Sequence, residues 1–575
     1  MQKVLTAAEM REVDRLTAEK YGIPSILLME NAAHAAARVI TEKLGGSVAG
    51  KSFLILCGKG NNGGDGAALA RILALNGAAV DVVLLGAIKE LKGEVQTNFE
   101  IVEKLTNDGF NLSRQMIGVW FGINSQGTLS LNYCSSKIEW QEDKELGEIF
   151  SRADIIIDAV LGTGVTRKLE NTYLTVVQSI GWKKEDRLSD FKPLIISLDL
   201  PSGLNANHSC QIGVNAQADL TIAFTAPKPA NVLAPASRFG GELITVDIGS
   251  PQELIDNSPS QLFVAERSDA QNWLRQTRFE KGSYKNKRGH ALLIVGSKNY
   301  TGAAVMAGDA AVRTGVGLVT VATPESAKDA VAGRLLPEVI TNAVAETETG
   351  SISAEAFARI EKLFAKIDAL AIGCGLEASG EETKNLVKKV VENRQTPVVI
   401  DADGLNALAP FELQGSDELP LVLTPHEGEM RRLMGVDKDF DFSDRVKIAR
   451  DFAQKHHVIL LLKGERSLIA APDGRVVVNP TGNEGLGKGG SGDTLTGIIT
   501  GFIAQSFAAP KDLSFYSPAD AKPSQITAAF DAVVAALYIA GLAGDIAAKK
   551  LGMRSMTASD VRECLGEAFR ELEND

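Results

Sequence analysis

The chain has 575 residues, enough for roughly two to four domains that each bury a full core. Its hydrophobic content of 45% and charged content of 23% are typical of globular proteins. A net charge of -12 and a pI near 5.3 argue against general binding to nucleic acid or to an anionic membrane.

The N-terminal segment Met1 to Leu16 has the charge pattern of an amphipathic helix and lacks the apolar core of a signal peptide. No stretch of the sequence has the length and apolarity that we expect of a transmembrane helix. The five cysteines are scattered without paired spacing, which favours a reducing compartment and indicates neither a zinc site nor a disulfide framework. We therefore predict a cytoplasmic protein without nucleic-acid or membrane partners.

Short apolar runs alternate with helical patterns from residue 50 to 250. Such runs, joined by helices, predict a parallel sheet that is covered on both faces. The predicted strands are residues 52–57, 80–85, 154–160, 194–198, 220–224 and 243–248. The segment 250–266 breaks this pattern and contains two prolines, so we interpret it as a linker.

A second alternating series follows the linker. Its predicted strands are 291–295, 318–322, 369–372, 398–401, 421–423 and 458–462, with a hairpin formed by 467–471 and 475–478. Helices predicted at 489–505 and 526–550 close the chain. Residues 113–148 and 507–524 resemble insertions, predicted to be surface loops or small β excursions. The sequence thus predicts two α/β domains.

The segment Gly58 to Gly66 reads GKGNNGGDG and lies between a predicted strand and a helical pattern over 65–76. A helix N-terminus offers free N–H groups and the positive end of a dipole to an anion, and glycine lets a ligand approach the backbone. The amides of Asn61 and Asn62 add oxygen atoms, so a cation is able to bind beside the anion. The alternative is a tight turn that needs glycine only for its geometry.

Three more loops follow strands of the first half: 158–164, 199–203 and 225–229. Ligands of an open parallel sheet bind beyond the carboxyl ends of its strands, so the fold brings these loops together. Asp199 is the natural candidate for general acid–base chemistry, and its alternative is a turn aspartate before proline. Asp158 is either a cation ligand or a carboxylate that caps a helix or turn.

These residues also supply the atoms that ions need. Oxygen atoms suited to a hard cation come from Asn62, Asp158 and Ser202. Backbone N–H groups suited to phosphate come from Gly162, Thr163 and Gly164.

The motifs NNGGDG, DAVLGTG and DLPSG, in this order, resemble the YjeF N-terminal family of NAD(P)H-hydrate epimerases over roughly residues 1 to 250. The resemblance implies a Rossmann-like doubly wound fold and a potassium ion held by Asn62, Asp158 and Ser202. It implies that Asp199 is the catalytic acid–base residue at the hydroxylated carbon of the nicotinamide ring. The implied substrate-binding residues are Asn61, Asn62, Gly63, Gly64, Asp65, Gly162, Thr163, Gly164, Val165, Thr166, Arg167 and Lys168.

The second half contains GGSGD at Gly489 to Asp493, at the start of an apolar helix. This turn predicts an anion hole with a carboxylate at its rim, where Asp493 is placed to take a proton from a hydroxyl during phosphoryl transfer. The alternative is an aspartate that merely favours the helix dipole. The loop 463–467 offers two cations to a nucleotide, whereas His426, taken alone, is better explained as a turn residue.

With KGSY, TPHEGE, KG and GGSGD, the second half resembles the YjeF C-terminal family of ribokinase-like NAD(P)H-hydrate dehydratases over roughly residues 268 to 570. The resemblance implies that the hydrated nicotinamide lies near Gly375, His426 and the catalytic Asp493. ADP is the usual nucleotide of bacterial members and ATP that of eukaryotic ones, and Mg²⁺ accompanies the nucleotide. The implied nucleotide-binding residues are Lys463, Gly464, Glu465, Arg466, Ser467 and Gly492.

Together these observations predict a bifunctional enzyme with an epimerase domain at 1–250 and a dehydratase domain at 268–575. Its substrates would be NADHX, NADPHX and ADP, and we expect a homo-oligomer. The alternative is a ribokinase-like kinase of a small alcohol or vitamin, fused to a non-catalytic nucleotide-binding module.

Overall fold

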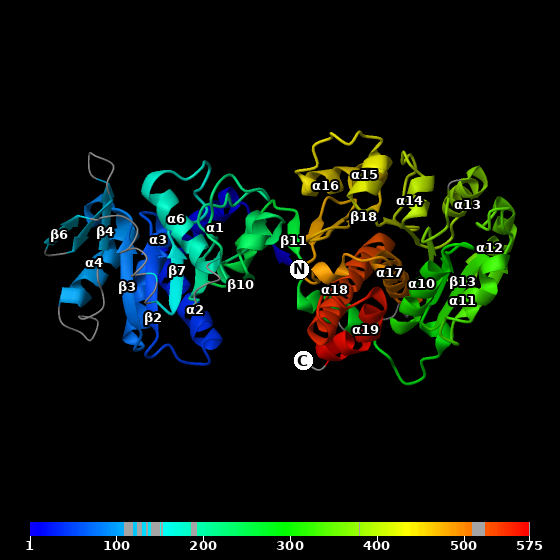
Figure 1. The fold of residues 1–575 in the computed structure, drawn as a ribbon, viewed down its shortest axis with the longest axis horizontal. Coiled ribbons are helices and arrows are strands. Elements are labelled where there is room, and N and C mark those ends of the chain that lie inside the picture. Colours follow the sequence, from blue (N-terminus) through cyan, green and yellow to red (C-terminus); the bar gives the residue numbers. More distant parts are fainter. Residues whose placement is uncertain are drawn as a thin grey trace. The chain divides into compact units, whose positions relative to one another are not determined.

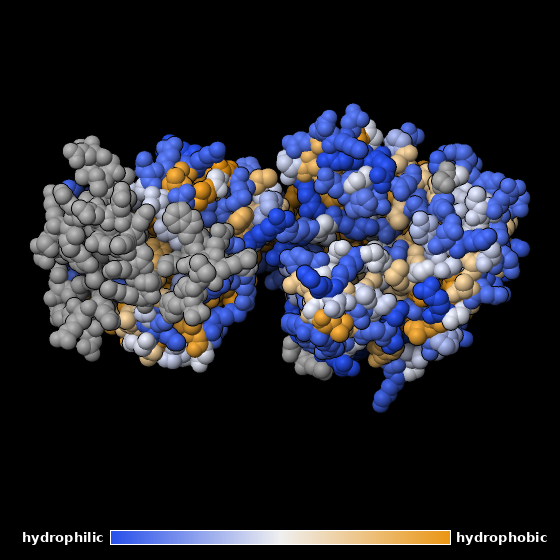
Figure 2. All heavy atoms as spheres, in the orientation of Figure 1, coloured by the Kyte–Doolittle hydropathy of each residue, from blue (hydrophilic) through white to orange (hydrophobic). Residues whose placement is uncertain are grey.

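The computed structural model describes residues 1–107, 119–123, 129–133, 136–139, 150, 153–185, 192–378, 380–508 and 524–573. The chain divides into two compact units (Figure 1). The first unit is Lys3–Ser260, and the second is Gln261–Asp575 together with Met1–Gln2. The exposed face in Figure 2 is mostly hydrophilic on each unit, as expected for surfaces that meet water.

The first unit is built on a sheet with the strand order β10-β9-β8-β7-β2-β3-β4-β5-β6. Strands β10 to β4 of this order run parallel, and β5 and β6 extend the sheet antiparallel. The strands are β2 (Ser52–Cys57), β3 (Ala79–Leu84), β4 (Val119–Ile123), β5 (Leu129–Tyr133), β6 (Ser136–Glu139), β7 (Ile155–Ala159), β8 (Leu194–Leu198), β9 (Leu220–Phe224) and β10 (Glu242–Val246). This confirms the predicted Rossmann-like parallel sheet. The strands β4 to β6 lie in the segment predicted to be an insertion.

Helices cover both faces of this sheet (Figure 1). Alternate strand residues face opposite ways: Ile55 packs in the core beneath α2, α3 and α4, whereas Leu54 packs in the core beneath α6. This is the doubly wound arrangement that the apolar runs predicted. The helices are α1 (Ala7–Tyr21), α2 (Ser25–Lys43), α3 (Asn61–Leu75), α4 (Gly93–Asn107), α6 (Asn171–Glu185), α7 (Pro229–Val232) and α8 (Gln252–Asp256), with 3-10 turns η1 (Ile88–Glu90) and η2 (Ala236–Phe239).

Helix α1 begins later than the sequence predicted. Thr6 and Glu9 form a reciprocal capping box that fixes the first turn, and Gly22 ends the helix in the left-handed conformation with a φ of 69°. The residues before the cap form the short strand β1 (Gln2–Lys3), so the predicted helix over 1–16 was wrong at its start.

The second unit has a mixed sheet with the order β1-β11-β20-β19-β18-β17-β16-β15-β12-β13-β14. The strands from β14 to β18 run parallel, and the predicted hairpin β19–β20 continues the sheet antiparallel. The strands are β11 (Leu262–Val264), β12 (His290–Ile294), β13 (Leu318–Pro324), β14 (Ile340–Val344), β15 (Ala369–Ile372), β16 (Val398–Ile400), β17 (Leu421–Leu423), β18 (Ile459–Leu462), β19 (Leu468–Ala470) and β20 (Val476–Val478). The sheet has the mixed form expected of a ribokinase-like fold. The sequence predicted neither β11 nor β14, and the proposed linker 250–266 is structured, because it contains α8 and β11.

A large core joins this sheet to α9, α10, α17, α18 and α19. The helices are α9 (Arg267–Gln276), α10 (Thr301–Arg313), α11 (Lys328–Ala332), α12 (Phe357–Phe364), α13 (Glu381–Glu392), α14 (Asp403–Ala407), α15 (Glu427–Met434), α16 (Arg445–His456), α17 (Ser491–Ala508), α18 (Gln525–Leu551) and α19 (Ala558–Glu573). The 3-10 turns are η3 (Lys285–Lys287), η4 (Glu325–Ala327), η5 (Ala354–Ala356) and η6 (Glu484–Leu486). Of the predicted insertion 507–524, residues 509–523 lie outside the described part of the chain.

Helix α18 corrects the statement that no stretch has the length and apolarity of a transmembrane helix. It meets both criteria, with a mean hydropathy of 1.9 over its most apolar window. However, 67% of that window is buried inside the protein, where the helix packs in the core of the second unit. Its apolarity is therefore that of a core helix.

Candidate active sites

Each sheet has a point where the chain reverses its direction of travel. In the first unit, β2 lies between β3 and β7, and in the second unit β12 lies between β13 and β15. At such a point the loops after neighbouring strands lead to opposite faces of the sheet, and open α/β sheets bind their ligands there, at the carboxyl edge. The predicted site loops of both units follow the carboxyl ends of these parallel strands.

The glycine-rich segment after β2 is mostly helix. Strand β2 ends at Cys57 and α3 begins at Asn61, so Asn61, Asn62, Gly63, Gly64 and Asp65 form the first turns of α3. A Cβ atom on Gly58 would lie 1.9 Å from the carbonyl oxygen of Val160, and one on Gly63 would lie 1.9 Å from that of Gly58. At these two positions glycine is therefore required for backbone packing, as the alternative interpretation held.

Asn62 behaves differently from its glycine neighbours. Its side chain is buried, and neither Oδ1 nor Nδ2 has a hydrogen-bond partner among the described residues. An ideal Cβ on Gly162 would lie 3.5 Å from the Asn62 side chain, so the loop after β7 reaches this amide. Because buried polar groups in folded proteins nearly always have partners, an amide of this kind is typical of a residue that contacts a ligand or an ion.

Asp158 and Ser202 are brought together at the same edge. The Asp158 carboxylate is fully buried and accepts hydrogen bonds from Ser197 Oγ (2.8 Å), the backbone N–H of Ser202 (2.8 Å) and Ser202 Oγ. Burial raises the pKa of Asp158, and these hydrogen bonds oppose the rise. The Ser202 hydroxyl also accepts a hydrogen bond from the N–H of Leu161 (2.8 Å), which ties the loops after β7 and β8 to each other.

Asp199 follows β8 directly and has a left-handed backbone with a φ of 63°. Its carboxylate forms an ion pair with Lys228, whose side chain is only 1% exposed. A non-glycine residue in this conformation stores strain that the surrounding structure must hold, and such residues cluster at functional sites. The sequence identified the loop 225–229 but not Lys228 itself, although a lysine between two prolines at the carboxyl end of a strand was the available signal.

Two further carboxylates face this pair. Burial, together with the charge of Asp199, raises the pKa of Asp14 to about 6, while Lys228 opposes the rise. The Asp14 Oδ1 atom is buried and has no hydrogen-bond partner among the described residues. The pKa of Asp65 is raised well above its usual value by burial and by Asp199 and Asp14. The buried ammonium group of Lys228 thus forms an ion pair with Asp199 and opposes the raised pKa of both Asp14 and Asp65. Asp14 was not identified from the sequence.

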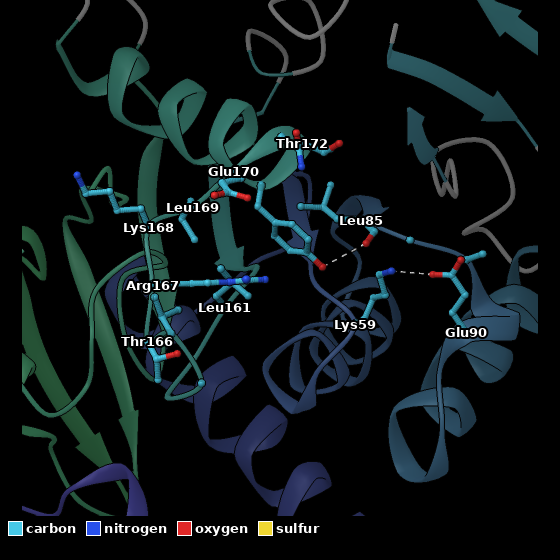
Figure 3. A pocket seen from close by; sticks show the side chains of 16 residues that line it. Lys59, Leu85, Glu90, Leu161, Thr166, Arg167, Lys168, Leu169, Glu170 and Thr172 are labelled. Carbon is cyan, nitrogen blue, oxygen red and sulfur yellow. Dashed lines mark hydrogen bonds and ion pairs between the residues drawn. The ribbon is translucent and has the colours of Figure 1, made fainter. Parts of the chain in front are cut away.

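A cavity of about 790 Å³ lies in the first unit, between the loops after β3 and β7 (Figure 3). Arg167 extends toward the middle of this view, whereas Lys168 points away, and Lys59 forms an ion pair of 2.7 Å with Glu90. Five predicted substrate residues line it: Gly164, Val165, Thr166, Arg167 and Lys168. The other predicted residues of this unit, Asp199 and Thr163 among them, do not line it.

In the second unit, α17 begins at Ser491, which puts Asp493 in its first turn. Asp493 is half-buried, and burial raises its pKa to about 6 with the help of the Asp401 charge. Cys374 and Lys463 oppose the rise. A carboxylate whose pKa lies this close to neutral is suited to accept and release a proton.

Lys463 is held by Asp401 rather than free. Its Nζ lies 2.7 Å from Asp401 Oδ1, and Thr496 Oγ1 donates to Asp401 Oδ2 at 2.7 Å. Burial lowers the pKa of Lys463, but the pairing with Asp401 outweighs it and the pKa is raised. An ideal Cβ on Gly492 would lie 3.6 Å from both Asp401 Oδ2 and Lys463 Nζ, so Gly492, Asp493 and Lys463 form one cluster.

The remaining predicted residues of the 463–467 loop make local contacts. Arg466 Nη1 donates to the carbonyl of Pro480 (2.7 Å), Ser467 Oγ donates to that of Gly464 (2.9 Å), and the carbonyl of Glu465 accepts from Arg445 (2.9 Å). The structure therefore gives Arg466 a role in holding the chain that leads to α17.

His426 and Gly375 lie in other loops at this edge. The half-exposed His426 is the N-cap of α15 and accepts from the N–H of Gly428 at 3.0 Å, which supports its interpretation as a turn residue. Gly375 has a φ of 63°, and a Cβ there would lie 2.8 Å from Ala303 and 2.9 Å from Tyr300.

Comparisons with known proteins cover both units. The family model described as "YjeF-related protein N-terminus" matches residues 25–230, and the model described as "NAD(P)H-hydrate dehydratase" matches residues 291–566. A "Bifunctional NAD(P)H-hydrate repair enzyme Nnr" of Moorella thermoacetica is 37% identical over 575 residues, covering 100% of this chain and 97% of the relative. One of Thermofilum pendens is 33% identical over 100% of this chain and 97% of its own. A solved ADP/ATP-dependent NAD(P)H-hydrate dehydratase of Bacillus subtilis, co-crystallized with ATP/Mg²⁺, is 28% identical and covers 54% of this chain and 99% of its own, with a TM-score of 0.44.

Proposed function

The chain belongs to the family of bifunctional NAD(P)H-hydrate repair enzymes, and we propose how its residues divide the repair. As a member of that family it is both an epimerase and a dehydratase of hydrated NAD(P)H. We assign the epimerase to residues 1–250 and the dehydratase to residues 268–575. One observation supports this assignment: each unit has one candidate acid–base carboxylate beside a glycine-containing turn, at the edge formed by the carboxyl ends of its parallel strands. These carboxylates are Asp199 in the first unit and Asp493 in the second.

The epimerase reaction needs an acid–base group at one carbon. Hydration of an enamine puts the hydroxyl on the carbon next to nitrogen, so the nitrogen lone pair is able to expel it as water, and water then adds to the other face of the resulting iminium carbon. A carboxyl group assists by protonating the leaving hydroxyl and deprotonating the returning water. Asp199 fits this role, because its Oδ1 is held by Lys228 while its Oδ2 has no hydrogen bond from the described residues.

The substrate of the epimerase would lie against the first turns of α3 and the loop 162–168. Two features support this placement: the unpaired amide of Asn62 and the cavity into which Arg167 extends. A guanidinium group there suits the phosphates of a dinucleotide.

A potassium ion fits the donor set at this edge. Asn62 has an unpaired amide oxygen, and Asp158 and Ser202 contribute a buried carboxylate and a hydroxyl that loop 158–164 joins to Asn62. These three residues would hold the ion, which would supply a positive charge for orienting substrate oxygens.

In the dehydratase, Asp493 would take the proton of the substrate hydroxyl as this oxygen attacks the terminal phosphoryl group of ADP. Loss of the resulting phosphate, together with a proton from the adjacent ring carbon, then restores the ring double bond and gives NAD(P)H, AMP and phosphate. The N–H groups at the start of α17 would hold the negative charge that develops on the transferred group. Lys463, Gly464, Glu465, Arg466, Ser467 and Gly492 would line the nucleotide.

Three further properties are also proposals. Mg²⁺ would arrive bound to the nucleotide phosphates, since the described residues contain no group of three or more His, Cys, Asp or Glu placed to hold a metal. We place the enzyme in the cytoplasm, which agrees with free thiols at the four described cysteines. We also expect a homo-oligomer.

The test is to mix the purified protein with NADHX and ADP and follow the absorbance of the reduced nicotinamide. We expect NADH to be recovered from both epimers, with ATP compared in parallel. Asp199→Ala should block use of the R epimer and spare the S epimer. No recovery of NADH, together with transfer of phosphate to another alcohol, would show a kinase instead. Full use of both epimers by Asp199→Ala, faster than spontaneous epimerisation, would contradict the role of Asp199.

A further inference from the structure

One short segment holds Asp199 at two points. Lys228 Nζ donates to the Asp199 carboxylate through Oδ1, and Asn231 Nδ2 donates to the Asp199 backbone carbonyl at 3.2 Å. The backbone N–H of Lys228 in turn donates to Asn231 Oδ1 at 2.7 Å. The two clamping residues therefore fix each other, and together they fix both the side chain and the backbone of Asp199.

The Asp199 carboxylate is anchored asymmetrically. Its Oδ1 also accepts from the backbone N–H of Phe224 at 3.3 Å, whereas no hydrogen bond from the described residues reaches Oδ2. The side chain remains 13% exposed. One oxygen is thus locked into the protein, and the other is presented at the carboxyl edge of the sheet.

Lys228 is an unusual residue to find in this position. Its side chain is 1% exposed, and Nζ donates to Asp199 and to the carbonyl of Phe224 (3.1 Å). A buried ammonium group loses its hydration, and a buried ion pair is often no more stable than an apolar replacement of the same volume. Stability alone therefore gives little reason for a buried lysine here.

We propose that Lys228 is a positioning residue of the epimerase reaction, which aims Asp199 Oδ2 at the hydroxyl-bearing carbon and places a positive charge against Oδ1. This inference rests on the proposed role of Asp199. The need for a charge comes from the groups that face the pair from each packed element: Asp14 on α1 and Asp65 on α3 are both carboxylates. Without the ammonium, three carboxyl groups would share one poorly hydrated space, where a like charge disfavours ionisation.

The test compares Lys228→Met with Lys228→Arg, following use of the R epimer with the dehydratase in excess. For Lys228→Met we expect kcat to fall about 100-fold, KM to stay within about twofold, and the limb of the kcat/KM profile that Asp199 sets to move to higher pH. Lys228→Arg keeps the charge but alters its reach, so kcat should fall several-fold while that limb stays in place. Turnover of the S epimer measures the dehydratase of the second unit and should be unchanged in both, and thermal melting measures folding of the first unit.

Lys43→Met is the matched control, because Lys43 forms an exposed ion pair with Glu242 in the same unit at 2.7 Å. It should change neither kcat nor the pH profile. A purely structural role for Lys228 predicts a lower melting temperature with no shift in the limb that Asp199 sets, and that result would overturn the inference.

If Lys228→Met does not fold, Lys228→Arg still tests the inference, because a wild-type kcat in Lys228→Arg would also overturn the positioning role of Lys228. A wild-type protein that does not interconvert the epimers would instead refute the proposed function itself.

Discussion

The two candidate sites share a fold position but differ in how lysine is used. In the first unit, the buried Lys228 pairs directly with Asp199, the proposed acid–base residue. In the second, Lys463 forms an ion pair with Asp401, and its charge acts on Asp493 only from a distance, where it opposes the rise in the pKa of Asp493. In the first site the lysine is thus paired with the proposed acid–base carboxylate, whereas in the second site it is paired with a neighbouring carboxylate.

The difference matches the two kinds of chemistry. This epimerase would give a proton to the leaving hydroxyl and take one from the returning water, both at one ring carbon, which favours a carboxylate fixed in one place. A group that starts phosphoryl transfer must take a proton from a hydroxyl near neutral pH, and burial raises the pKa of Asp493 to about 6 for that task. Lys463, held by Asp401 beside Gly492, remains close to where phosphate would bind.

The largest effect that separates the sites should come from Asp493→Asn. Removing the base should lower ADP-dependent recovery of NADH by about 10³-fold, within the usual range for a general base. Epimerisation, followed by exchange between the R and S forms, should be unchanged. Asp473→Asn, in the exposed β19–β20 turn, is the control and should retain full activity. Retention of dehydratase activity by Asp493→Asn would mean that another group takes the proton.

A substitution at Gly58 should damage the first site alone. A Cβ there would lie 1.9 Å from the Val160 carbonyl oxygen, so Gly58→Ala should force β2 and β7 apart and destabilise the first unit by about 1–3 kcal/mol. Gly60→Ala is the matched control, because nothing lies within 4 Å of its Cβ position. Epimerase activity and the melting of each unit by calorimetry measure the effect. Equal stability of the two variants would show that the turn tolerates a side chain.

The sequence predicted the central strands well because they are buried on both faces. Strands β8, β9 and β15 match their predicted bounds, since each is a short, mostly apolar run in a parallel sheet. Strand β14 was missed because its half-polar sequence ITNAV lies at the sheet edge, where one side of the strand has no partner among the described strands. Strand β11 was missed because three residues carry no usable period.

The loops of the first candidate site were predicted from one rule of sheet topology. Loops after parallel strands share an edge, and this rule found the loops that hold Asp158, Ser202 and Asp199. The rule does not predict which side chains from distant parts of the chain form ion pairs or face one another. Asp14 resembled one more charge on an amphipathic helix, and only the packing of α1 shows that it faces Asp199 and Lys228.

Asp14→Asn tests whether the first site is crowded with negative charge. The pKa of Asp14 in the folded state, about 6, lies above the ordinary aspartate value of 3.8, so between these two pH values the folded state binds more protons than the unfolded state. The ionised Asp14 therefore costs stability at pH 7, and the cost disappears below about pH 4. Asp14→Asn should raise the free energy of unfolding of the first unit by on the order of 2 kcal/mol at pH 7 and leave it unchanged at pH 4.

Glu12→Gln, which breaks only an exposed pair with Arg15 on the same helix, should leave this free energy nearly unchanged, because exposed ion pairs contribute little to stability. Urea unfolding at the two pH values measures both variants. Loss of stability in Asp14→Asn at pH 7 would mean that the carboxylate has a partner that outweighs its burial.

The smallest expected effect is the pH dependence of the dehydratase, and it bears directly on Asp493. The base must be ionised to accept a proton, and its pKa is raised to about 6. The kcat/KM for the S epimer should therefore be half-maximal near pH 6 and fall about tenfold per unit below it. Bound nucleotide adds negative charge, which disfavours ionisation of Asp493, so the acidic limb of kcat should lie at higher pH than that of kcat/KM.

Lys463→Met removes the positive charge that opposes the rise in the pKa of Asp493, so it should move the acidic limb of kcat/KM to higher pH as well. A limb that stays in place in this variant would show that Lys463 acts only on Asp401 and that Asp493 is tuned by burial alone.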